Sequence, residues 1–205
     1  MRIPKELKCV IFDLGGVLVD LDWQRCVDAF KAIGADKMEQ ILSTTHQEGF
    51  LLDYEQGLIT TDDFRNQVRA ITERKVSDSE VDAAMNALLV GLPEEKLQLI
   101  LALKKKYKIF MLSNTNETSY TYIVENYFEK RGKKVEEYFD KVYLSYEMGL
   151  SKPDKRIYQQ ILDESGFAPQ ECLFLDDSEA NLIPPREMGL HTLYVEPYSD
   201  IELEF

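Results

Sequence analysis

The sequence predicts an α/β protein, a doubly wound parallel β-sheet with a small α-helical cap domain inserted into it. Three observations support this fold class. Short, almost continuously apolar segments recur along the chain, and helical patterns separate them. Residues 20 to about 90 hold helical patterns without a convincing strand. Finally, polar residues stand where several of the apolar segments end. Alternating strands and helices are typical of a parallel sheet covered by helices on both faces.

The clearest strand is predicted at residues 7–13, which are almost all apolar and rich in β-formers. Such a run is typical of a strand that is covered on both faces. Similar runs predict four more strands, at residues 109–113, 142–145, 172–176 and 192–195.

The best helix of the predicted core spans residues 93–107. Pro93 and two glutamates open it, lysines close it, and leucines and isoleucines supply an apolar stripe. A second helix is predicted at residues 153–165, where Gly166 ends it.

The inserted region predicts helices at residues 23–33, 37–44, 61–72 and 77–89. The sequence from Thr61 to Asp63 is typical of a helix N-terminus, and Ser77 with Glu80 forms a capping-box pattern. We therefore expect residues 1–19 and 90–205 to form the core and residues 20–89 to form a helical cap.

Composition narrows the class of function. Among the 205 residues, 44% are hydrophobic and 30% are charged, which is typical of a soluble globular protein. The net charge of −13 argues against nucleic-acid or membrane partners but allows a phosphorylated substrate, because a metal ion and a lysine can create a local positive site. The sequence lacks a secretion signal and a membrane span, and its cysteines are few and scattered. We expect a cytoplasmic protein with reduced thiols, as a monomer or weak homodimer.

Polar residues that could carry chemistry stand at the ends of three predicted strands. Asp13 is followed by Gly15 and Gly16, whose backbone N–H groups could approach an anion closely. Ser113 and Asn114 follow the second strand, where hydroxyl and amide donors could bind a phosphate. Each feature alone also has a simpler explanation, as a turn or a helix cap.

Asp176 and Asp177 directly follow a buried run. Adjacent carboxylates there are costly unless a cation compensates them, and Mg²⁺ suits oxygen ligands best. Lys152 opens a predicted helix and could be a fixed positive charge, although an isolated lysine is usually solvated at the surface.

Four stretches in order, FDLGGVLVD, MLSNTN, GLSKPDKRIY and FLDDSEAN, resemble the motifs of the haloacid dehalogenase-like superfamily. The inserted helical region matches the position of that family's cap. Among its members, the chain is most similar to sugar-phosphate phosphatases of the α-glucose-1-phosphate phosphatase type, which share the DLG turn and the LSNTN segment.

This resemblance implies a role for each matching residue. Asp13 would be the nucleophile and Lys152 would neutralise charge at the reacting centre. Gly15, Gly16, Ser113, Asn114 and Lys152 would contact the phosphate. Mg²⁺ would be bound by Asp13, the carbonyl of Gly15 and Asp177, with Asp176 a ligand or a neighbour of the ligands. The implied reaction removes phosphate from a small phosphorylated metabolite, plausibly a sugar phosphate, through an aspartyl-phosphate intermediate.

Position 15 departs from the family's pattern, because its phosphatases have a second aspartate there that serves as general acid and base. Dehalogenase and phosphonate-cleaving relatives also lack this residue, but the former generally lack the acidic pair and the latter need a lysine from the cap. The cap contains Lys31, Lys37 and Lys75, and none of them stands in a sequence context that indicates catalysis. A catalytically weak phosphate sensor or interaction protein is a further alternative.

Without this acid, the proton for the leaving group must come from solvent, a cap residue, Asp20 or Asp22, or the leaving group must be good. We therefore expect phosphates of acidic oxygens to be preferred. The cap should select the substrate, and the candidates are Trp23, Arg25, His46, Glu55 and Gln56, each of which could equally be structural.

Overall fold

The computed structural model describes residues 4–42, 49–72, 74–201 and 203. Within these residues the main sheet has five strands in the order β5–β4–β1–β6–β7, and each neighbouring pair is parallel. The strands are β1 (Cys9–Phe12), β4 (Lys108–Ser113), β5 (Lys141–Leu144), β6 (Cys172–Asp176) and β7 (His191–Tyr194). The predicted fold class is confirmed, and each predicted strand of the sheet is present.

The central strand β1 is buried on both faces of the sheet. Val10 and Phe12 belong to one hydrophobic cluster, whereas Cys9 and Ile11 belong to the cluster on the opposite face. This two-sided burial explains why the strand is almost continuously apolar in sequence. All three cysteines are free and buried, as predicted.

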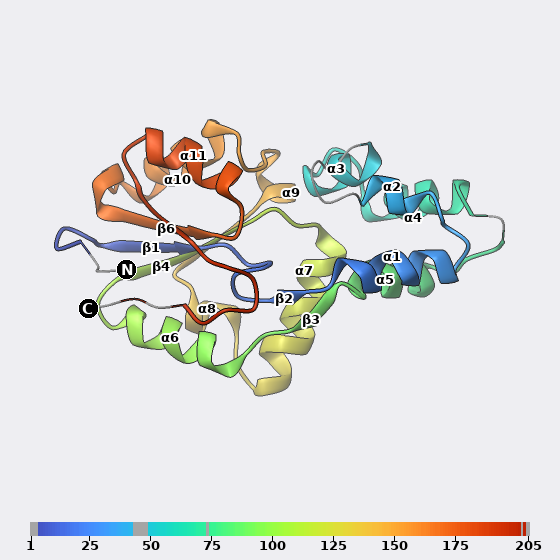
Figure 1. Ribbon diagram of the computed structural model, residues 1–205, viewed down its shortest axis with the longest axis horizontal. Helices are drawn as coiled ribbons and strands as arrows, with labels where there is room; N and C mark the ends of the chain where they lie inside the picture. Colours follow the sequence, from blue (N-terminus) through green and yellow to red (C-terminus); the bar gives the residue numbers. More distant parts are fainter. Residues whose placement is uncertain (1–3, 43–48, 73, 202, 204–205) are drawn as a thin grey trace.

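Helices cover both faces of the sheet. Figure 1 shows α10 and α11 on one face and α6 and α8 on the other. The helices outside residues 20–89 are α6 (Glu94–Lys104), α7 (Glu117–Ile123), α8 (Val135–Tyr138), α9 (Ser145–Met148), α10 (Lys155–Ser165) and α11 (Glu179–Glu187). A π-helical turn (Val124–Phe128) and a 3-10 turn (Glu129–Arg131) extend α7, and another 3-10 turn (Pro169–Glu171) precedes β6. None of the described helices is long and apolar enough to cross a membrane.

The helices of the predicted cap lie together beyond one edge of the core in Figure 1. They are α1 (Trp23–Ala32), α2 (Met38–Ile41), α3 (Phe50–Glu55), α4 (Thr61–Ala70) and α5 (Asp78–Asn86). The predicted capping box of Ser77 and Glu80 is confirmed. The N-cap of α4 is Thr60 rather than Thr61, since the hydroxyl of Thr60 accepts from the Asp63 N–H and the Asp63 carboxylate accepts from the Thr60 N–H. Helix α3 was not predicted, and positions 43 and 44 of the predicted helix 37–44 lie outside the described residues.

The expectation that residues 20–89 lack a strand is wrong. Strand β2 (Asp20–Leu21) pairs with the antiparallel strand β3 (Leu89–Gly91) where the chain enters and leaves the helical region. Two or three residues are too few to show an alternating pattern, so the pairing is visible only once the two ends of the insertion meet. We propose that this pair joins the cap to the core.

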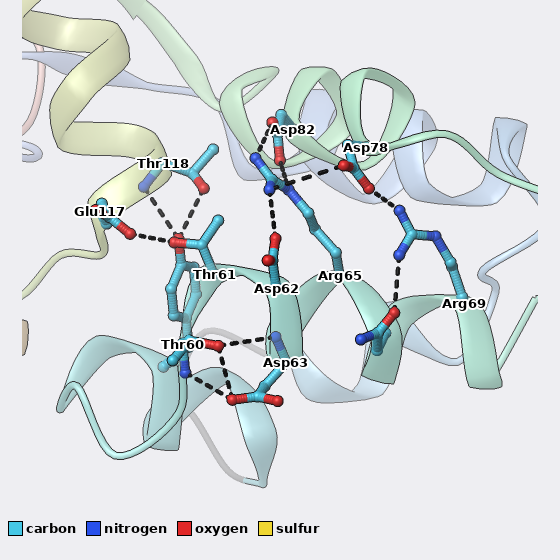
Figure 2. A network of polar contacts seen from close by, with 12 residues as sticks. Thr60, Thr61, Asp62, Asp63, Arg65, Arg69, Asp78, Asp82, Glu117 and Thr118 are labelled. Atoms are coloured by element: carbon cyan, nitrogen blue, oxygen red, sulfur yellow. Dashed lines mark hydrogen bonds and ion pairs between the residues drawn. The ribbon is translucent and has the colours of Figure 1, made fainter.

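Polar contacts hold the cap helices to each other and to the core (Figure 2). Between α4 and α5, the guanidinium of Arg65 donates to both carboxylate oxygens of Asp82, over 2.9 and 2.7 Å. Between cap and core, the hydroxyl of Tyr54 lies 2.7 Å from that of Thr118 at the start of α7. The helical region is therefore also in contact with α7 through side-chain hydroxyl groups.

Candidate active site

The predicted chemical residues meet at the carboxyl edge of the sheet. Asp13 directly follows β1, Ser113 is the last residue of β4, and Asp176 is the last residue of β6. Because β1 pairs with β4 on one side and with β6 on the other, these three strand ends are neighbours. Open α/β sheets bind their ligands at this edge, where the strand order reverses.

Lys152 lies between two carboxylates of this edge. Its Nζ is 2.8 Å from Oδ1 of Asp13 and 2.6 Å from Oδ2 of Asp176. The side chain of Lys152 is only 1% exposed, and those of Asp13 and Asp176 are 9% and 0% exposed. Lys152 is therefore a buried cation fixed by two charge-assisted contacts, and not a solvated surface charge.

The backbone of Lys152 is held by Asn114. The Asn114 side chain donates from Nδ2 to the Lys152 carbonyl (2.9 Å), and its Oδ1 accepts from the Lys152 N–H (2.8 Å). This reciprocal pair ties the loop before α10 to the end of β4. The carboxamide of Asn114 thus positions the lysine, a contact that the predicted phosphate-binding role did not include.

Asp176 accepts hydrogen bonds at both carboxylate oxygens. Its Oδ2 accepts from Lys152, while its Oδ1 accepts from the Ser178 N–H (2.8 Å) and from Nδ2 of Asn181 (3.0 Å). Asn181 was not singled out from the sequence, although it ends the fourth motif, FLDDSEAN. Since three donors already fix this carboxylate, Asp176 orients the lysine.

Asp13, Asp176 and Asp177 form a compact acidic cluster, in which one carboxylate oxygen of each lies within 4.8 Å of the others. Gly16 lies next to the carboxylate of Asp177. A Cβ at Gly16 would come 2.0 Å from Oδ2 of Asp177, and the φ angle of Gly16 is +76°, so glycine is required here. Three clustered carboxylates fit a hard divalent cation such as Mg²⁺, which prefers oxygen ligands.

The charges of the cluster perturb one another. Burial raises the pKa of Asp13 well above its ordinary value, the neighbouring aspartates raise it further, and Lys152 opposes the shift. Burial also raises the pKa of Asp177, with a further contribution from Asp176. Burial alone would lower the pKa of Lys152, but the two carboxylates raise it above its ordinary value, so the lysine stays charged. The positive charge of Lys152 therefore does not fully compensate the negative charge of the three carboxylates.

In the glycine turn after β1, one backbone N–H group differs from the expected phosphate-binding arrangement. The Gly16 N–H donates to the Val19 carbonyl over 2.8 Å, so the donor that we expected at the phosphate already has a partner within the turn. The Leu14 N–H donates to Oδ1 of Asp13 (2.7 Å) and helps to orient the carboxylate. Ser113 is buried, with its Oγ 3.5 Å from the Asn114 carbonyl oxygen.

A small cavity of about 70 Å³ lies between this edge of the core and the helical region. Gly15, Ser113 and Asn114 contribute from the core, and Trp23 and Glu55 contribute from the predicted cap. Most of its remaining wall is apolar, formed by Leu14, Val19, Leu21, Met85, Leu88, Leu89 and Ile123.

The remaining substrate-selecting candidates do not line this cavity. Arg25 is exposed, and the side chain of Gln56 donates to the Ser151 hydroxyl over 2.8 Å. His46 lies outside the described residues.

Comparison with known proteins identifies the family. A profile of haloacid dehalogenase-like hydrolases matches residues 7–189. The D-ribitol-5-phosphate phosphatase of Bacteroides thetaiotaomicron is 34% identical over 194 residues, covering 95% of this chain and 94% of that protein. The crystal structure of a HAD family enzyme from Bacteroides thetaiotaomicron, in complex with magnesium and inorganic phosphate, matches with a TM-score of 0.90 and 41% identity over 95% of this chain and 96% of that one. A predicted HAD-like hydrolase from Porphyromonas gingivalis matches with a TM-score of 0.87 and 31% identity, over 95% and 94% of the two chains.

Family profile, overall fold and the order of the four motifs therefore agree along nearly the whole chain, and this protein belongs to the haloacid dehalogenase-like hydrolases.

Proposed function

We propose that this protein is a Mg²⁺-dependent phosphatase that transfers the phosphoryl group of a small phosphorylated metabolite to Asp13 and then hydrolyses the aspartyl phosphate. One observation carries the proposal: a buried carboxylate at the end of β1 is paired with Lys152 and clustered with Asp176 and Asp177. The named relatives support the same reaction class, because one is a phosphatase and another was crystallised with magnesium and phosphate.

Each residue of the site has a task in this reaction. A carboxylate oxygen of Asp13 attacks phosphorus, and the P–O bond to the leaving group breaks. Lys152 stays charged and lies 2.8 Å from Asp13, so it reduces the repulsion between an anionic nucleophile and an anionic phosphate. Asp176 and Asn114 hold the lysine from opposite ends, through its ammonium group and its backbone. Ser113, at the strand end beside Asp13, would donate to a phosphoryl oxygen.

The acidic cluster would hold the metal. We assign Asp13 and Asp177 as its carboxylate ligands, together with the carbonyl of Gly15, and Asp176 as their neighbour, because Asp176 already accepts three hydrogen bonds. Mg²⁺ bound there would neutralise negative charge on the phosphate and polarise its oxygens.

The proposed substrate class is a sugar or polyol phosphate. The 34% identical relative, a D-ribitol-5-phosphate phosphatase, supports it. The alternatives that position 15 left open have less support. The acidic cluster argues against a metal-free dehalogenase, and none of Lys31, Lys37 and Lys75 lines the cavity, as a phosphonate-cleaving enzyme would require. The complete lysine and carboxylate arrangement also argues against a sensor that only binds phosphate. The predicted cytoplasmic location, oligomeric state and domain boundaries stay predictions.

The experiment replaces Asp13 with asparagine, which is nearly isosteric but cannot form the covalent intermediate. Phosphate release is measured with Mg²⁺ on a panel of sugar and polyol phosphates that includes D-ribitol 5-phosphate, and a circular dichroism melt is recorded on the same preparation. Asp163→Asn, the same change at an exposed position of α10, is the control. We expect Asp13→Asn to melt like a folded protein without turnover. Activity equal to the wild type would refute the assignment of the nucleophile.

A further inference from the structure

The proposed reaction leaves one proton unaccounted for. When the P–O bond of an alkyl phosphate breaks, the alkoxide needs a proton, and general acids supply it at a gain of roughly 10²–10⁴ in rate. Position 15 offers no carboxyl group. A Cβ at Gly15 would lie 2.9 Å from Cδ1 of Leu21, so the end of this side chain would have to shift to admit a larger residue.

The two aspartates considered from the sequence are engaged elsewhere. Oδ1 of Asp20 lies 3.1 Å from the ammonium of Lys96, which is itself buried. Asp22 is the N-cap of α1 and accepts from the Arg25 N–H over 3.2 Å. Neither aspartate lines the cavity above Gly15.

One acidic residue among the described positions does line this cavity. Glu55, the last residue of α3, is 4% exposed and shares the cavity with Gly15, Ser113 and Asn114. Most of the other residues that line the cavity are apolar, and Thr115, Asn116 and Ser119 add polar side chains to its wall. Glu55 therefore brings an acid from the helical region to a cavity that Gly15, in the turn after Asp13, and Ser113 also line.

The segment that carries Glu55 is fastened to the core. The Ser145 hydroxyl donates to the Glu55 carbonyl over 2.6 Å and accepts from the Thr115 N–H over 3.0 Å, which joins α3 to the loop after Ser113. Two residues on, Gly57 packs against the backbone of Tyr146, with a φ of +66° and room for no side chain, since a Cβ would come 2.0 Å from the Tyr146 carbonyl oxygen. These contacts fix the backbone of Glu55 relative to the loop after Ser113.

We propose that Glu55 is the general acid and base of this enzyme, replacing the carboxyl that position 15 lacks; this rests on the phosphatase function proposed above. In the first step, Asp13 attacks phosphorus, the ester bond breaks with its electron pair on the leaving oxygen, and the carboxyl of Glu55 gives that oxygen its proton. In the second step, the Glu55 carboxylate takes a proton from water as the water oxygen attacks phosphorus. The P–O bond to Asp13 breaks, and its electron pair returns to the aspartate.

This assignment removes the disadvantage that we expected for alkyl phosphates. The wild type should therefore cleave a primary-alcohol ester such as D-ribitol 5-phosphate without needing an acidic leaving group.

The test uses Glu55→Gln with D-ribitol 5-phosphate, whose alkoxide needs a proton, and p-nitrophenyl phosphate, whose phenolate does not. We expect kcat/KM for the alkyl substrate to fall roughly 10²–10⁴-fold. For the aryl substrate, kcat/KM should stay unchanged, because the first step needs no acid. Its kcat should fall, because the second step lacks its base, so a rapid burst of one nitrophenolate per enzyme precedes slow turnover. The burst also proves that the variant is folded. Glu55→Asp, which keeps an acid on a shorter side chain, should recover part of the alkyl activity, and Glu39→Gln, an exposed cap glutamate, should match the wild type.

Equal losses on both substrates, or no loss on either, would overturn the role of Glu55. Either result is distinct from failure of the phosphatase proposal, which Asp13→Asn tests independently. If Asp13→Asn still releases nitrophenolate at the wild-type rate, the nucleophile is wrong, whatever Glu55 does.

Discussion

Replacement of Lys152 by methionine should be severely destabilising in the absence of divalent cations. The change keeps a long apolar stem but removes an ammonium that lies 2.8 Å from Asp13 and 2.6 Å from Asp176. Removing one partner of a buried ion pair costs about 3–5 kcal/mol, because the remaining charge is left buried without compensation. For a protein of this size, each kcal/mol lowers the melting temperature by about 2–4 °C, so we expect a fall of about 6–20 °C. Mg²⁺ should restore part of this loss, since a cation in the acidic cluster replaces the missing charge.

The measurement is a thermal melt followed by circular dichroism, with and without Mg²⁺, alongside phosphate release. Lys155→Met is the matched control, because Lys155 is 59% exposed and pairs with Glu187 at the surface, where an ion pair contributes only about 0–1 kcal/mol. We expect the control to keep its activity and melt near the wild type. A Lys152→Met protein that melts with the wild type in the absence of Mg²⁺ would refute the inference that this ammonium compensates two buried carboxylates.

Four further predictions follow from single contacts. Asp177→Ala should lose both the Mg²⁺-dependent turnover and the rise in melting temperature that Mg²⁺ gives the wild type; turnover that persists in excess chelator would contradict the metal site. Gly16→Ala should abolish turnover, because its Cβ would come 2.0 Å from Oδ2 of Asp177 at a φ of +76°, whereas Gly91→Ala, which has open space, should keep activity. Tyr54→Phe removes a hydroxyl that links the cap to the core. It should lower the free energy of unfolding by about 1 kcal/mol and speed amide hydrogen exchange in α3 and α4. Unchanged exchange would show that the contact does not hold the cap. Hydrogen bonds from the backbone and side chain of its capping partner lower the pKa of Glu80 from 4.5 to about 2, so the folded state binds this proton more weakly than the unfolded state. The ionised Glu80 carboxylate therefore stabilises the folded state above pH 4.5, and this contribution disappears as the pH falls toward 2. Glu80→Gln and the wild type should differ in unfolding free energy at neutral pH and converge near pH 2.

The sequence by itself determined the fold class and the edge of the sheet that carries the chemistry. The inner strands β1, β4 and β6 are short, mostly apolar runs, because burial on both faces excludes polar residues from their interior. Parallel strands bring their carboxyl ends to one edge, so Asp13, Ser113 and Asp176 could be placed together before their contacts were known. The resemblance to haloacid dehalogenase-like enzymes, based on four short motifs, is confirmed by the family profile.

Only the tertiary structure decided which side chains touch. Residues from separate elements meet in the contact of Lys152 with two carboxylates, in the hydrogen bonds of Asn114 to the Lys152 backbone, and in the approach of Leu21 to Gly15. The same holds for Glu55, which the sequence offered as one of several cap candidates and which the packing of α3 on the core brings to the cavity. The physical reason is that periodicity and capping are properties of neighbouring residues along the chain, whereas the pairing of distant side chains depends on how the packed elements meet in space.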